Sequence, residues 1–161
     1  MNRATEKLRQ VFPQVLQKQI FMFAEEISLA DLPPSATDWV ETRIYFSGPI
    51  TGDMRLALPR EIEMEIAANF LGKDVEDSEV AKFCEDALKE TINVLCGHML
   101  TSIAGEEPVF DLSIPIVTAL SSDQYAKLSE LPESVCFDVE GKCVVVSISI
   151  SDSIPPLLNG N

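Results

Sequence analysis

The sequence predicts an α/β sandwich, in which a largely antiparallel sheet packs against helices. A helical apolar period over residues 77–105 and strict alternation over residues 39–47 and 142–150 support this fold class. The expected order is helix, two strands, two helices, one strand and a final hairpin, which differs from the regular strand–helix alternation of nucleotide-binding folds. A chain of 161 residues is expected to form one domain, over residues 1–161.

The N-terminal segment, residues 5–27, is predicted to be helical because its apolar residues recur every three or four positions. The apolar stripe consists of Leu8, Val11, Phe12, Val15, Leu16, Ile20 and Phe23. Pro13 either starts this helix or kinks it after a short opening turn, because proline removes a backbone hydrogen bond from a helix interior. Residues 28–37 are expected to form a turn-rich connector and residues 154–161 a loose tail.

Two neighbouring segments predict an antiparallel strand pair. Residues 39–47 and 54–58 place apolar side chains at every second position, and turn-forming residues 48–53 lie between them. A short helix is expected from Pro59 to Gly72, because proline favours the start of a helix and glycine its end.

The C-terminal part is predicted to consist mainly of strands. Residues 109–117 read as a strand, and Pro115 within it favours an edge position or an irregularity. Residues 122–131 are ambiguous, with a short helix as one option. Residues 135–139 and 142–150 predict a hairpin whose apolar face must be buried against helices.

The longest uninterrupted helical pattern starts at Asp77 or Ser78, either of which can cap it, and ends at Gly105. Its predicted apolar side consists of Ala81, Cys84, Leu88, Ile92, Leu95, Met99 and Ile103. The opposite side consists of Glu79, Asp86, Glu90, Asn93 and Gly97. A core helix needs only the first side. The second is therefore either a solvated polar face with a chance asparagine or a docking surface.

Asn93 is the unexpected residue of this helix, because asparagine in a helix interior costs roughly half a kcal/mol relative to alanine. Glu90 lies one turn before it and Asp86 a further turn back, so the three side chains emerge side by side. Gly97 lies one turn beyond Asn93. Its missing side chain either gives clearance to another molecule or allows close packing of a second helix.

This row resembles the signature of the CheC/CheX/FliY phosphatases of bacterial chemotaxis. The similar pattern is Asp86-x-x-x-Glu90-x-x-Asn93-x-x-x-Gly97, followed by a strand with Pro115. The resemblance extends over residues 8–150. It includes Gly48 and Gly52 in the first hairpin, Leu71-Gly72 at a helix end, and DLSIP at residues 111–115. Because Glu-x-x-Asn occurs only once, whereas CheC-type members often carry two such motifs, the chain is more similar to CheX. The resemblance therefore implies a CheX-like fold.

The resemblance implies that the substrate is a phosphorylated CheY-like receiver domain. Asn93 would insert beside the aspartyl phosphate and orient the attacking water, while Glu90 would dock on the receiver's lysine. Asp86 would extend that contact or remain solvated. Mg²⁺ is expected on the receiver, and no cofactor on this chain; Asp86 and Glu90 alone offer too few ligands for a metal site. The alternative function is a receiver-binding adaptor without turnover.

Charge and composition restrict the other partners. The formal net charge of −14 disfavours nucleic acid and anionic membranes as partners. No apolar run approaches the ~18 residues that span a bilayer, and the N-terminus is polar, so we expect a cytoplasmic protein without a secretory leader. The cysteines, Cys84, Cys96, Cys136 and Cys143, are expected to be reduced, buried and small-hydrophobe-like. His98, the single histidine, is expected to be a packing or boundary residue.

A homodimer is also expected. CheX-like proteins pair through their sheets, and the hairpin of residues 135–150 is predicted to present a sheet edge here. Such a pairing would protect an edge that is otherwise prone to aggregation. It would leave Asn93 of each subunit exposed.

Overall fold

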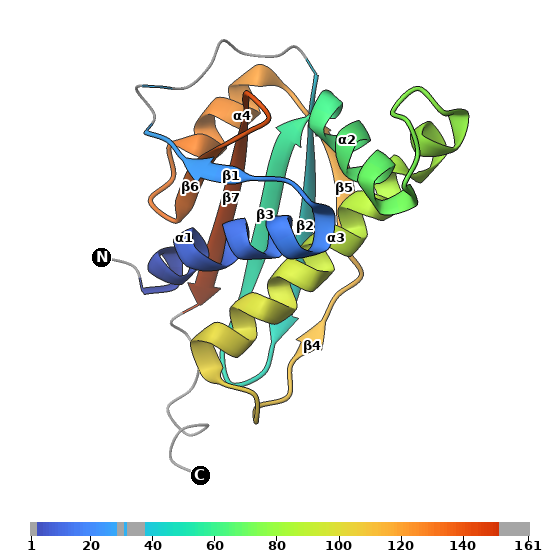
Figure 1. Ribbon diagram of the computed structural model, residues 1–161. Coiled ribbons are helices and arrows are strands. Elements are labelled where there is room, and N and C mark those ends of the chain that lie inside the picture. Colours follow the sequence, from blue (N-terminus) through green and yellow to red (C-terminus); the bar gives the residue numbers. More distant parts are fainter. Residues whose placement is uncertain (1–2, 29–30, 32–37, 152–161) are drawn as a thin grey trace.

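The computed structural model describes residues 3–28, 31 and 38–151, and Figure 1 shows α1 and α3 crossing one face of a sheet with α4 behind it. The strands of the described residues follow the order β1-β6-β7-β3-β2-β4, and β5 also pairs with β2. Every pairing is antiparallel. The strands are β1 (Ala24–Glu26), β2 (Trp39–Ser47), β3 (Thr51–Pro59), β4 (Asp111–Leu112), β5 (Ile116–Leu120), β6 (Ser134–Val139) and β7 (Lys142–Ser151). The predicted fold class is confirmed.

The sheet separates two hydrophobic cores, which the helices cover from either side. The helices are α1 (Arg3–Val15), which continues as the π-helix η1 (Leu16–Ile20), then α2 (Arg60–Leu71), α3 (Ser78–Ala104) and α4 (Ser122–Ser129). The larger core lies between the sheet and α1, α2 and α3, and a smaller one lies beneath α4. In the smaller core, Trp39 of β2 stacks on Tyr125 of α4. Helices α1, α2 and α3 therefore share one face of the sheet, and α4 covers the other.

The first strand pair and the short helix confirm their predictions. Strands β2 and β3 pair in register from Trp39 opposite Pro59 to Phe46 opposite Gly52. Pro59 then lies just before the first residue of α2. Gly72 ends α2 in a left-handed conformation (φ 65°, ψ 36°), and its backbone N–H donates to the carbonyl of Ala68.

The N-terminal helix differs from its prediction at both ends. It starts at Arg3, runs through Pro13, and ends at Ile20 instead of continuing to residue 27. Strand β1 follows and pairs with β6, because the open edge of β6 offers this segment regular strand hydrogen bonds. Phe23, predicted to be in the apolar stripe, is consequently 69% exposed. The connector at residues 28–37 lies largely outside the described residues.

The C-terminal hairpin lies inside the sheet, so the prediction that it presents a sheet edge is wrong. β7 lies between β6 and β3, and β1 covers the other side of β6. Both faces of β7 are buried: Val144, Val146 and Ile148 belong to the larger core and Val145 to the smaller one. The predicted burial of its apolar face is therefore confirmed. The predicted tail, residues 154–161, lies outside the described residues.

The two edges of the sheet are formed by β1 on one side and by β4 and β5 on the other. Pro115 lies between β4 and β5 and divides the single strand that was predicted over residues 109–117. Its predicted edge position and irregularity are both confirmed. The ambiguous segment that follows forms α4, which starts with a capping box made by Ser121 and Gln124.

Candidate functional site

The long helix α3 positions the candidate site. Asp77 caps it by accepting a hydrogen bond from the backbone N–H of Glu79 at 2.8 Å, and Gly105 ends it, as predicted. Its buried residues are Val80, Ala87, Leu88, Thr91, Ile92, Leu95, Cys96, Met99 and Leu100. Ala81, predicted on the apolar side, is exposed. The first turns of α3 pack sideways against α2, where Phe83 meets Phe70 edge-on at 6.3 Å, so the buried arc is rotated there.

The polar row lies on the exposed side of α3. Asp86, Glu90, Asn93 and Gly97 are all exposed, so the structure brings the four predicted site residues onto one face. Within the described part of the chain, no hydrogen bond or ion pair engages the side chains of Asp86, Glu90 or Asn93. These carboxylates and the carboxamide are therefore available to another molecule.

Gly97 has open space around it. A Cβ atom added at this position would meet no heavy atom of the described chain within 4 Å, apart from the helix's own nearby backbone. The option that Gly97 allows close packing of a second helix is therefore excluded for the described residues. The remaining option is clearance beside Asn93.

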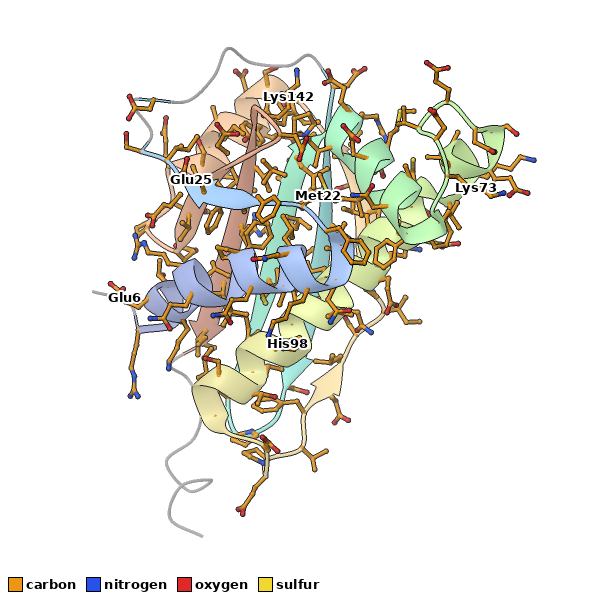
Figure 2. The ribbon with its side chains drawn as sticks, viewed as in Figure 1. Glu6, Met22, Glu25, Lys73, His98 and Lys142 are labelled. Carbon is orange, nitrogen blue, oxygen red and sulfur yellow. The ribbon has the colours of Figure 1, made fainter. Side chains whose placement is uncertain are left out.

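A groove of about 730 Å³ runs between α3 and the N-terminal helix, and Asn93 forms part of its wall. Its lining residues are Val11, Gln14, Val15, Lys18 and Gln19 from α1 and η1, Asn93, Val94, Gly97, His98, Thr101 and Ser102 from α3, and Glu106. His98 is exposed and borders this groove where α3 passes beneath α1, which fits a boundary residue and not a packing one (Figure 2).

Sequence reasoning missed the contribution of α1 and η1 to this groove. Gln14, Lys18 and Gln19 lie on the polar side of the predicted N-terminal helix, so the sequence indicated only that they face away from the core. Which helix they would face depends on the tertiary crossing of α1 and α3. Lys18 places a positive charge on the wall of the groove that also contains Asn93 and Gly97.

The thiol beneath the row is unreactive. Burial raises the pKa of Cys96 to about 12, so its sulfur stays protonated at neutral pH. Cys136 and Cys143 are buried free thiols, as predicted, whereas Cys84 is only half-buried. Among the described residues, no group of three or more potential ligands is arranged to hold a metal ion. In the same part of the chain, no helix is both long and apolar enough to cross a membrane.

Comparisons with known proteins identify the family. A family model described as "Chemotaxis phosphatase CheX" matches residues 40–140, whereas no curated protein matches the chain. A CheX protein of Desulfovibrio desulfuricans is 14% identical, covering 93% of this chain and 100% of that one, with a TM-score of 0.67. A chain from the CheX-CheY-BeF3-Mg²⁺ complex of Borrelia burgdorferi is 19% identical, covering 92% and 98%, with a TM-score of 0.65. A CheC-like superfamily protein from Shewanella is 21% identical, covering 94% and 99%, with a TM-score of 0.63. At these identities, the structural likeness shows a shared fold.

Proposed function

This chain belongs to the CheX family of chemotaxis phosphatases, and on that premise we propose that it hydrolyses the aspartyl phosphate of a CheY-like receiver. The observation that carries the proposal is the exposed pair Glu90 and Asn93, one turn apart on α3 and without a partner in the described chain. The Borrelia burgdorferi structure is described as a CheX-CheY complex, which supports a receiver as the partner here.

The proposed reaction requires positioning more than new chemistry, because the receiver brings its own Mg²⁺ and lysine. The carboxamide oxygen of Asn93 accepts a hydrogen bond from a water molecule and holds it in line with the scissile bond. The water oxygen bonds to phosphorus while the bond from phosphorus to the aspartyl oxygen breaks. The aspartate leaves as a carboxylate; one proton of the water stays on the product, hydrogen phosphate, and the other is released to solvent.

The rest of the row is proposed to fix the receiver in place. Glu90 pairs with the receiver's lysine, which sets the depth at which Asn93 inserts. Asp86, one turn further back, extends this contact. Gly97 leaves room beside Asn93 for the receiver's backbone, consistent with the open space around it.

The direct test is the decay of a phosphorylated receiver with and without this protein. Faster decay with the protein present supports the phosphatase. Binding without faster decay assigns the chain to the alternative function, a receiver-binding adaptor. If the chain neither binds any receiver of the source organism nor accelerates its dephosphorylation, both the phosphatase and the adaptor are contradicted.

Glu90→Gln is expected to weaken binding of the phosphorylated receiver about five- to tenfold, because it removes one side of an ion pair. This difference from the wild type should shrink at high salt, since salt screens charges at an exposed interface. Turnover at saturating receiver should fall less than in Asn93→Ala. Titrating the receiver at two salt concentrations measures both effects.

The control for this variant is Glu130→Gln, which neutralises an exposed carboxylate next to α4, on the opposite side of the sheet. Its affinity and turnover should match the wild type. If Glu90→Gln loses as much turnover as Asn93→Ala at saturation, docking and catalysis are not separate roles of these two residues.

We also propose a homodimer, with the contact at the β4–β5 edge and not at the C-terminal hairpin. Leu112, Ile114 and Ile116 are 38%, 82% and 55% exposed along this edge. Apolar side chains on a free edge are an aggregation liability unless another chain covers them. The contact leaves the exposed face of α3 free for a receiver.

Ile116→Lys is expected to convert the dimer to a monomer. Pairing at this edge would bury the charged lysine side chain in the interface, which is energetically costly. Light scattering at micromolar concentration measures the mass. Ala126→Lys, on the exposed side of α4, should remain dimeric. A monomeric wild type, or a dimer that buries Glu90 and Asn93, would contradict the proposed assembly.

The cellular location remains a prediction. Free thiols at Cys84, Cys96, Cys136 and Cys143 favour a reducing compartment, and we propose the cytoplasm. A single domain over residues 1–161 is likewise proposed.

A further inference from the structure

Phe21 ends η1 in a left-handed backbone conformation, with φ 63° and ψ 35°. Its backbone N–H donates a hydrogen bond to the carbonyl of Leu16, so the conformation is part of the helix cap. The residue itself is 74% exposed. Glycine and asparagine are the usual residues at such a cap, because the left-handed conformation crowds a Cβ atom against the backbone.

The same chain uses glycine where it needs the same cap. Gly72 ends α2 with φ 65° and ψ 36°, which is nearly the conformation of Phe21. An aromatic ring at this position costs backbone strain, and its exposure shows that little packing within the described chain offsets that cost. Residues in strained backbone conformations are concentrated at functional sites, so we expect the ring of Phe21 to contact a partner outside the chain.

A second exposed aromatic residue accompanies Phe21. Phe23 is 69% exposed, while Met22 between them is only 2% exposed and anchors the segment in the core. The side-chain amide of Asn69 on α2 donates to the carbonyl of Ile20 at 2.9 Å. The two rings therefore extend from a backbone that the core and α2 hold in place, which lowers the entropy cost of using them in an interface.

The aromatic pair follows, within a few residues of the chain, the part of η1 that lines the groove containing Asn93. Lys18 and Gln19, three and two residues before Phe21, line one wall of this groove, and Asn93 lies on the other. Figure 2 labels Met22 at the end of α1, where α2 and α3 approach it, and His98 further along α3. A molecule seated over Asn93 and the groove would thus meet the edge formed by η1.

We propose that Phe21, with Phe23 beside it, is an aromatic anchor for the receiver, extending the docking surface from α3 across the groove to η1. The inference rests on the proposed function and names a specificity surface for it. Aromatic residues are enriched among the few side chains that supply most of the binding energy of an interface. The receiver is a better occupant than a second copy of this chain, because the groove lined by Lys18 and Gln19 of the same segment contains Asn93, and the β4–β5 edge has its own exposed apolar residues.

The test is the variant Phe21→Gly. Glycine is the residue that ends α2 in the same left-handed conformation, at Gly72. The apparent KM for the phosphorylated receiver should rise about tenfold, whereas kcat at saturation should stay within about twofold of the wild type. The affinity for the receiver loaded with Mg²⁺ and beryllofluoride should fall by a similar factor. The Tm should stay unchanged or rise, because glycine relieves the strain.

The matched control is Val109→Gly, which removes an exposed apolar side chain (83% exposed) that lies just before the β4–β5 edge. Its KM and affinity for the receiver should equal those of the wild type. An equal rise of KM in both variants would overturn the inference, because loss of any exposed apolar side chain would then suffice.

Three further results for Phe21→Gly would also overturn the inference while leaving the proposed function intact. The first is a KM and an affinity equal to those of the wild type. The second is a Tm lowered by about 5 °C or more, which would mean that the ring stabilises the fold. The third is a changed oligomeric state, which would mean that the ring contacts a second copy of the chain. If the wild-type protein neither binds nor dephosphorylates a receiver, the proposed function fails first, and the anchor fails with it.

Discussion

Asn93→Ala is expected to slow the dephosphorylation of the receiver by about 100-fold or more, because misplacing an attacking group has effects of that order. The fold should remain intact. Asn93 is exposed and has no partner in the described chain, and alanine is the better helix residue. The Tm should therefore hold or rise slightly. Decay of the phosphorylated receiver and thermal unfolding of the same preparation measure both results.

Two companion variants sharpen the interpretation. Asn93→Asp places a negative charge near the phosphoryl group and should be at least as inactive, although its size is nearly unchanged. Gln17→Ala removes an exposed carboxamide from η1 that does not line the groove and should keep full activity. Unfolding of Asn93→Ala would identify a structural residue, and wild-type turnover would remove Asn93 from the mechanism.

Gly52→Ala is expected to destabilise the fold by about 2–4 kcal/mol, in the range of severe overpacking. A Cβ atom at this position would lie 2.0 Å from the carbonyl oxygen of Ser149 and 2.8 Å from the ring of Phe46. The carbonyl belongs to β7, which pairs with β3 at the centre of the sheet, so the backbone itself would have to move. The midpoint of denaturant unfolding measures the loss.

Gly97→Ala is the matched control, because it adds the same methyl group where no heavy atom lies within 4 Å. It should stabilise α3 by about 0.5–1 kcal/mol, the usual advantage of alanine over glycine in a helix. Equal changes in stability for the two variants would contradict the packing described around Gly52.

The sequence was sufficient for most elements and for the position of the polar row. The helical period of α3 and its cap at Asp77 reflect local preferences, which act wherever the segment packs. The exposure of Asp86, Glu90 and Asn93 follows from the same period, because the opposite side of the helix is strongly apolar. The family prediction, which depended on the spacing of these residues, is confirmed by the family model.

The errors concern choices that only the tertiary structure makes. Phe23 continues the helical apolar period of the sequence, but the chain is no longer helical there. The residues after it form β1, and pairing of β1 with β6 determines the conformation of this segment. The order of the strands depends on which edges meet, so a hairpin at the sheet centre looks the same in sequence as one at its rim. The groove also depends on how α1 crosses α3, which their separate periods do not specify.

The central position of β7 has a consequence for the order in which the molecule can be assembled during synthesis. Strand β3 ends at Pro59, but one of its two neighbours, β7, starts at Lys142. While the ribosome adds the intervening residues, β3 can pair with β2 and must leave its other edge open. The middle of the sheet therefore closes late, and the many distant contacts made at that moment favour slow folding. A nascent chain stalled before β7 would expose the edge of β3 that pairs with β7 in the folded protein.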